Sequence, residues 1–423
     1  MEQTKKFSGY FQAVLVALMT FTCGMSYGAY GMLIVPLADR LGISIAQAGI
    51  PATIETIAAF AAGVLGAGIL IEKWTARNCV LIGCIIAALF VPAYAYLPSF
   101  ALVSLFEVVV GASMGIGYST GMAAFIRDWF IEKRETVIGV CTAAIGFGAA
   151  AGTWLFGKLD TTVGLNTTCV VFACLGIFCI IVYLIALRSP DQVGQKPLGY
   201  EKAVELSRKE GKEEGDVGFG VDFKTARKSP SLYLIMAAVL LWALSMVLTP
   251  YLATILMTSG LDEMTAANGS SVANLAVAAM AIILGVLTSK LGTRAYIVTA
   301  FGAGILGLVV LFFWTRSQSM GIMYLAALLM GAGYIVGTTA GPMLTTKVFG
   351  NKAYDQIIPW VFGMRCLGLG IGVLALPSMA TAQGSWSMPI LLAIAMMVVA
   401  LLIGLTAVKL APMNKLHSED ELK

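Results

Sequence analysis

Apolar residues run in long stretches over almost the whole chain, separated by short polar loops. Most stretches hold about 20 residues or more, the length with which an α-helix crosses roughly 30 Å of hydrocarbon. Ten-residue segments that alternate between apolar and polar positions, typical of membrane β-barrels, are absent. The pattern predicts an all-α polytopic membrane protein with twelve helices, at residues 9–35, 46–71, 78–97, 100–126, 136–158, 165–187, 231–258, 265–289, 295–314, 319–345, 354–381 and 386–409.

The composition agrees with this pattern. Hydrophobic residues make up 59% of the 423 residues and charged residues only 12%, against about 25% charged residues in soluble proteins. A water-soluble fold could not bury that much apolar surface. The first stretch follows Lys5 and Lys6 and shows no small-residue cleavage site, so we expect it to remain as the first helix and not to be removed as a signal peptide.

Basic residues are distributed unevenly among the loops. Of the 27 Lys and Arg residues, 23 lie in the tails and even-numbered loops, whereas the odd-numbered loops hold Arg40, Lys158 and Arg316. Because basic residues resist translocation, this distribution predicts that both termini are cytoplasmic. We expect a multi-pass protein of the plasma or inner membrane.

A single long polar stretch, residues 188–230, separates six predicted helices from the other six. It predicts an N-terminal half over 1–187, a cytoplasmic central loop over 188–230, and a C-terminal half with its tail over 231–423. Nine basic and eight acidic residues nearly cancel in the loop, which favours a solvated linker over a regulatory domain. A surface helix could form over 200–214.

The two halves also resemble each other. Three segments of the first half recur 216 to 219 residues later: 115–121 at 331–337, 68–77 at 285–294, and 130–133 at 349–352. Two parallel six-helix repeats are typical of transporters that rock one half against the other around a site at the midplane.

Cysteine and histidine give no indication of a metal or cofactor. The eight cysteines lie almost all within apolar stretches, where Cys behaves as a small hydrophobic residue. The single histidine, His417, lies in the polar C-terminal tail. We find no phosphate-binding loop and no nucleophile with a base. We therefore expect no enzyme, no catalytic residue, no cofactor, no metal and no nucleic-acid partner.

The loop over 68–77, Gly-Ile-Leu-Ile-Glu-Lys-Trp-Thr-Ala-Arg, is similar to the signature between helices two and three of the major facilitator superfamily. The chain resembles that family over essentially its whole length. The loop lacks the usual glycine after the basic residue, which its second copy keeps at Gly292. The resemblance implies a monomer with a cytoplasmic gate, formed by Glu72, Lys73, Arg77, Lys290 and Arg294.

Shorter motifs resemble the oxalate/formate antiporter and monocarboxylate transporter branch of that family. They lie at 24–30, 36–37, 44–47 and 128–139. This resemblance implies a small organic anion as substrate. Members that bind carboxylates commonly carry an arginine in the eighth helix, where this chain offers only Asn274 at comparable depth. The resemblance to this branch therefore does not identify the substrate.

Three ionisable residues lie well inside predicted helices, where a charge at the centre costs about 2.5–3.5 kcal/mol. Arg365 lies near the midplane in the eleventh helix, where oxalate-type relatives place a second basic residue, and its guanidinium can hold a carboxylate through two hydrogen bonds. Glu55, at similar depth in the second helix, fits an inter-half ion pair as well as a substrate role. Glu107, in the fourth helix, fits a proton carrier as well as a protonated side chain bonded to a neighbouring helix.

Polar aromatic residues would complete the site. Tyr27 and Tyr30 share one face of the first helix, and Tyr118 and Tyr334 occupy matching repeat positions. With Arg365 and Asn274, these four tyrosines are the predicted substrate-binding residues. Tyr251, near the end of the seventh helix, is more simply explained as an interface anchor or a packed core residue.

These features favour a secondary active transporter that moves a mono- or dicarboxylate by alternating access, through proton symport or anion exchange. Proton-coupled efflux of a drug-like or cationic solute is the alternative, which Arg365 disfavours. A membrane receptor or enzyme on the same helices would need a signalling domain or a catalytic constellation, and the sequence has neither. The expected partners are the organic anion, membrane lipid and protons.

Overall fold

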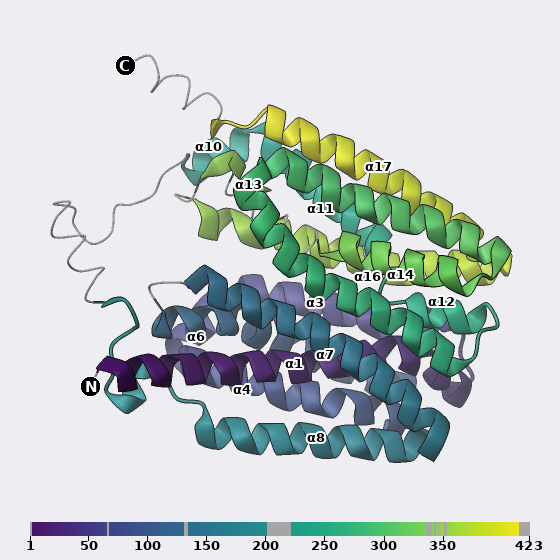
Figure 1. The fold of residues 1–423 in the computed structure, drawn as a ribbon, viewed down its shortest axis with the longest axis horizontal. Coiled ribbons are helices and arrows are strands. Elements are labelled where there is room, and N and C mark those ends of the chain that lie inside the picture. The colour runs from purple at the N-terminus through teal and green to yellow at the C-terminus, as the bar shows by residue number, and fades with distance from the viewer. Residues whose placement is uncertain are drawn as a thin grey trace.

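The computed structural model of the chain consists almost entirely of helices (Figure 1). It describes residues 2–65, 67–130, 134–200, 221–335, 341, 344–345, 347–350 and 353–413. Within these ranges the only extended pairing is an isolated bridge between Phe130 and Leu198. The helices are α1 (Glu2–Leu41), α2 (Ile45–Ala48), α3 (Ile50–Leu65), α4 (Ala67–Tyr96), α5 (Phe100–Ser113), η1 (Met114–Gly121), α6 (Met122–Trp129), α7 (Arg134–Val163), α8 (Leu165–Ala186), η2 (Pro190–Val193), α10 (Phe223–Lys228), α11 (Pro230–Met246), α12 (Leu252–Thr258), α13 (Glu263–Ser317), α14 (Met320–Tyr334), α16 (Tyr354–Gln383) and α17 (Ser387–Lys409).

Among the described residues, eight helical segments are long and apolar enough to cross a membrane. The outer faces of these helices carry large apolar side chains such as Phe178, Ile185 and Leu402, each more than half exposed. A helix that is hydrophobic on all sides is typical of a membrane span. The predicted all-α polytopic membrane fold is therefore confirmed.

The helix α13 covers the eighth and ninth predicted segments and consists of two legs that run back along each other (Figure 1). Gly331 of α14 packs against Ala273 of the first leg, and Gly333 packs against Gly304 of the second leg. In a straight helix Ala273 and Gly304 would lie about 46 Å apart at 1.5 Å per residue. The chain therefore reverses between them, as the predicted loop between these segments requires.

The seventh predicted segment, 231–258, is interrupted. The helix α11 ends at Met246, α12 begins at Leu252, and the chain makes a turn over 247–251. Pro250 lies in this turn, and proline lacks the N–H group that a continuous helix would use and disfavours helical geometry in the preceding residue. The prediction of one continuous helix was wrong here.

The fourth predicted segment changes its geometry in the middle. Met114–Gly121 form a π-helix between α5 and α6, a form that is frequent at functional sites. Gly117 in this turn lies against Cys79 and Gly83 of α4. Gly333, the repeat equivalent of Gly117, lies in the same way against Gly304.

The helices form two groups. Figure 1 shows α1 to α8 together in one group and α10 to α17 in the other, with the start of α1 and the end of α17 at the same end of the molecule. We call this the terminal end, and the opposite end, where α12 and the start of α13 lie, the distal end. The predicted limits of the halves, at 187 and 231, remain a prediction.

Both groups contain the same close helix crossing. Two glycines, four residues apart, let one helix touch the backbone of its neighbour, and the two crossings are 219 to 220 residues apart in sequence. Gly148 and Gly152 of α7 lie against Phe21 and Met25 of α1, whereas Gly368 and Gly372 of α16 lie against Leu240 and Leu244 of α11. The repeat seen in the sequence is thus also present in the packing.

The two groups meet where α1 passes the turn over 247–251. A Cβ built on Gly31 would lie 2.7 Å from the carbonyl oxygen of Pro250, so only glycine fits there. Thr254 Oγ1 donates a hydrogen bond of 2.9 Å to the carbonyl oxygen of Gly31. Gly31 and Pro250 are 219 positions apart, so two repeat-equivalent positions touch each other.

The ends of the central loop are attached at equivalent places. Leu198 N–H donates to the carbonyl oxygen of Trp129 at 2.8 Å, and Val221 N–H donates to that of Phe349 at 2.9 Å. Residues 201–220, which include most of the predicted surface helix, lie outside the described residues.

Candidate functional site

The candidate site lies beside the contact between α3 of one group and α16 of the other. Thr53 Oγ1 of α3 donates a hydrogen bond of 2.7 Å to the carbonyl oxygen of Gly370 in α16. Gly363 of α16 lies against the ring of Phe60. Glu55 and Arg365 lie on these two helices, so the packing brings two of the predicted site residues to the same contact between the groups.

Glu55 is bonded within its own group. The Tyr27 hydroxyl of α1 donates a hydrogen bond to the Glu55 carboxylate. Arg365 is near enough to act electrostatically on Glu55, but among the described residues the structure shows no ion pair between them. The inter-half ion pair expected as one alternative is therefore not formed in this conformation.

Arg365 has an incompletely satisfied guanidinium. Its Nε is buried and has no hydrogen-bond acceptor among the described residues, while the side chain as a whole remains partly exposed. The guanidinium lies over the ring of Phe362, with Cζ 5.5 Å from the ring centroid. An aromatic face holds the charge in place without occupying its hydrogen-bond donors.

Glu107 is the most deeply buried acid of the site. Its side chain is fully buried, and neither carboxyl oxygen has a hydrogen-bond partner among the described residues. The Tyr94 hydroxyl lies beside it and is also without a partner. An ionised carboxylate without donors or a cation is costly in such a place.

A cluster of aromatic rings lies beside both glutamates. Tyr27 stacks on Phe90 at a centroid distance of 5.6 Å, and Phe90 contacts Tyr94 at 5.0 Å. Tyr30 meets Tyr94 edge to face at 5.9 Å. Sequence reasoning missed Phe90 and Tyr94, although their spacing of four residues places both on one face of the third segment.

The other group contributes Tyr251 to this cluster. Tyr251 is only 1% exposed, and its hydroxyl lies 3.4 Å from that of Tyr30. Gly49 leaves room for this hydroxyl, since a Cβ on Gly49 would collide with it. Tyr251 is therefore packed between the groups and does not lie at a membrane interface.

Asn274 and Tyr334 have their contacts outside the cluster around Glu55 and Arg365. Asn274 Nδ2 donates a hydrogen bond of 3.2 Å to Thr153 Oγ1, which joins α13 to α7. Tyr334 packs on Trp242 at a centroid distance of 5.8 Å. The side chain of Tyr118 lies outside the described ones. The structure thus brings Tyr27, Tyr30, Glu55, Glu107 and Arg365 together and places Asn274 in a second contact between the groups.

Among the described residues, this second contact, between α7 and α13, shows no ion pair. Ser271 Oγ donates a hydrogen bond of 3.1 Å to the carbonyl oxygen of Ala150. Gly146 lies against Ala278. The contact between α3 and α16 has an equivalent bond, from Thr53 to Gly370, so the two contacts correspond under the repeat.

Of the predicted gate residues, the structure describes the side chain of Arg77. Its Nε donates to the carbonyl oxygen of Leu187 at 2.7 Å, and its Nη2 donates to that of Leu184 at 3.2 Å. Arg77 therefore caps the last turn of α8 within its own group. The side chains of Glu72, Lys73, Lys290 and Arg294 lie outside the described ones, and the gate remains a prediction.

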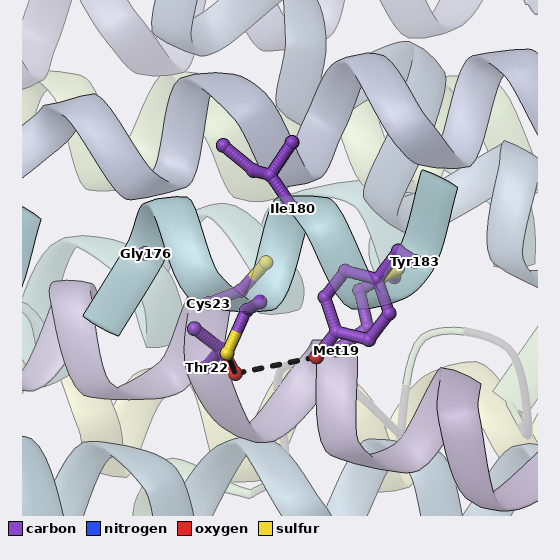
Figure 2. Close-up of a pocket in the computed structure, with 7 residues that line it drawn as sticks. Met19, Thr22, Cys23, Gly176, Ile180 and Tyr183 are labelled. Atoms are coloured by element: carbon purple, nitrogen blue, oxygen red, sulfur yellow. Dashed lines mark hydrogen bonds between the residues drawn. The ribbon is translucent and has the colours of Figure 1, made fainter. Parts of the chain in front are cut away.

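The small gap between α1 and α8 is not a second site. It is lined by Met19, Thr22 and Cys23 of α1 and by residues of α8, and Figure 2 shows the ring of Tyr183 beside Met19 and Thr22. Thr22 Oγ1 lies 3.4 Å from the Tyr183 hydroxyl, and the gap leaves no room for a water molecule. In the described part of the chain, no group of three His, Cys, Asp or Glu residues could hold a metal ion.

Comparison with known proteins gives one match. The sequence model described as the Major Facilitator Superfamily matches residues 16–373, which includes every residue of the cluster around Glu55 and Arg365. No curated protein matches the sequence.

Proposed function

The chain belongs to the major facilitator superfamily and is a secondary transporter, and from this premise we propose that its substrate is a small organic anion, a mono- or dicarboxylate. The anion would cross the cytoplasmic membrane by alternating access, with both termini of the protein in the cytoplasm. The site between the two groups, around Arg365, would bind it.

The observation that carries this proposal is the state of Arg365. An arginine inside a membrane helix without a paired carboxylate is costly, unless a ligand or water-filled space satisfies it. Its planar guanidinium suits bidentate binding of a carboxylate. Phe362 fixes its position, and Glu55, held by Tyr27, does not pair with it in this conformation.

Proton symport is the coupling that these residues support best. Glu107 is buried without a hydrogen-bond partner among the described residues, an arrangement in which a carboxyl group favours its neutral form. Uptake of one proton together with a monocarboxylate would also neutralise the charge that crosses the membrane. Anion exchange would need Arg365 but not Glu107.

Thermal unfolding of the purified protein with a panel of small carboxylates, cations and neutral solutes tests the substrate class, since a ligand stabilises the folded state by mass action. We expect a carboxylate to raise the midpoint in the native protein but not in Arg365→Gln. Arg316→Gln is the matched control, because Arg316 lies over Phe312 in a similar contact, 4.8 Å from the ring centroid. Stabilisation by cations alone, or equal stabilisation of Arg365→Gln, would contradict the proposal.

A further inference from the structure

Two carboxyl groups from different helix groups meet at the distal end of the contact between α7 and α13. A Cβ on Gly157 of α7 would lie 2.6 Å from the Ala267 Cβ of α13 and 3.9 Å from the carbonyl oxygen of Glu263. Asp160 follows Gly157 by three residues and Glu263 precedes Ala267 by four, so each lies one turn further toward the distal end on the same helix face. The two carboxyl groups are therefore close enough to interact across the contact.

Two carboxylates cannot share a hydrogen bond unless one of them carries a proton. If both were ionised at this distance they would repel each other. Glu263 is the first residue of α13 and precedes the apolar part of that helix. Burial, the hydrogen bond that protonated Glu263 can donate to Asp160, and the negative charge of Asp160 raise the pKa of Glu263 to about 7.

The surrounding charges do not neutralise this pair. Arg40 of α1 is bound to the carbonyl oxygens of Tyr94 and Leu97 at 2.7 and 2.9 Å, and Lys158 of α7 is exposed. Asp262, next to Glu263, caps α13 by accepting a hydrogen bond of 2.9 Å from Thr265 N–H. Among the described residues, neither Asp160 nor Glu263 forms an ion pair.

We propose that Asp160 and Glu263 form a proton-operated lock, which holds the distal ends of the two helix groups together while one proton is shared and releases them when both carboxyl groups ionise. The inference requires the two groups to move apart at the distal end, but it does not depend on the substrate or on Arg365.

The direction of the pH effect follows from linkage. A free glutamate has a pKa of about 4.3, so the closed distal end, with Glu263 at about 7, binds the proton more tightly than the open one. Proton binding therefore favours closure, and the favourable contribution is lost as the pH rises through about 7. With the predicted orientation, the lock would respond to the pH outside the cytoplasm.

Distance measurement between two spin labels tests the lock. Val163, at the end of α7, and Met320, at the start of α14, are both exposed at the distal end, in different groups. Each is replaced by cysteine, in a protein whose exposed Cys174 is changed to serine. The distance distribution is then recorded in lipid nanodiscs without substrate, over a range of pH from about 5 to 9 that spans the titration of Glu263.

In the native background we expect the short distance to dominate at low pH and a longer one to gain at high pH, with a midpoint near neutrality. Glu263→Gln keeps a donor for Asp160 that does not titrate, so the short distance should persist at high pH. Glu263→Ala should remove the pH response and weaken closure at low pH. Asp262→Asn, a change in the exposed neighbouring acid, should leave the midpoint unchanged.

Three results would overturn the lock. They are a distance distribution that does not change with pH in the native background, a transition in Glu263→Gln with the native midpoint, and a loss of the transition in Asp262→Asn like that expected in Glu263→Gln. Since no substrate is present, none of these results bears on the proposed organic anion.

Discussion

The two contacts that join the helix groups are built alike but differ in charge. In each, a hydroxyl group donates to a backbone carbonyl of the partner helix, Thr53 to Gly370 and Ser271 to Ala150. The contact between α3 and α16 also holds Glu55 and Arg365, whereas at comparable depth the contact between α7 and α13 has the neutral pair Asn274 and Thr153. At this depth, both contacts have a hydrogen bond that joins the groups, but only the contact between α3 and α16 has ionisable side chains.

The difference indicates that the repeat preserves the contacts on which the relative motion of the two groups depends. It does not preserve the residues that would bind the substrate. Neutral hydroxyl–carbonyl bonds between membrane helices are weak, about 0.6 kcal/mol on average, and can be made and broken in each cycle. The guanidinium of an arginine within a membrane helix cannot be left unsatisfied at such a small cost. We therefore expect substitutions in the charged contact to affect binding and those in the neutral contact to affect the balance between conformations.

Arg365→Gln should have the largest effect. Loss of two charge-assisted hydrogen bonds, each worth about 1.5–3 kcal/mol, should weaken binding of the anion by more than roughly 100-fold. Equilibrium binding of the carboxylate found in the unfolding screen measures this. Arg365→Lys keeps the charge but not the planar fork, so it should recover part of the affinity; full recovery would argue against bidentate binding.

Glu107→Gln tests whether Glu107, in the fourth segment, couples transport to protons independently of the charged contact. We expect loss of proton-driven accumulation in vesicles, which for one proton per anion is about tenfold per unit of pH gradient. Exchange of labelled for unlabelled substrate without a gradient should continue. Retained pH-driven accumulation would remove Glu107 from the coupling, and lost exchange would show that it serves binding or folding.

Asn274→Ala tests the neutral contact. It removes the hydrogen bond to Thr153 while the remaining bonds of Thr153, to the carbonyl oxygens of Gly28 and Ala149, stay in place. We expect stability to fall by about 1 kcal/mol and anion affinity to stay within the error of the binding measurement. A loss of affinity as large as that in Arg365→Gln would erase the distinction between the two contacts.

Thr53→Val and Ser271→Ala should have the smallest effects, and they form a matched pair. Each removes one hydroxyl–carbonyl bond between the groups, at a cost of about 0.6 kcal/mol to the closed distal end. Accessibility of an engineered cysteine at the distal end should rise to a similar extent in both variants. Unequal changes would mean that the two contacts do not contribute equally to the free energy of closing the distal end.

The sequence predicted correctly those helices whose bounds follow from the length of an apolar segment. The last two predicted segments, 354–381 and 386–409, match α16 and α17 within a few residues. The break at 247–251 was missed because its apolar residues continue the run, and only Pro250 signals a turn.

The candidate site could be predicted only in part. Arg365, Glu55 and Glu107 were recognised because a charge stands out in an apolar segment. Their partners were not, because the contacts of Tyr94 and Tyr251 depend on how helices distant in sequence pack. Asp160 and Glu263 were missed because acidic residues at the ends of apolar segments are ordinary in loops.

The contact between Gly31 and Pro250 has a mechanical consequence. Two repeat-equivalent positions that touch each other must lie close to the axis that relates the two groups. When bodies turn about such an axis, points on it travel least and points at the rim travel farthest. The contact at Gly31 should therefore be kept throughout the transport cycle. We expect a larger residue at this position to slow turnover in both directions without favouring either side of the membrane.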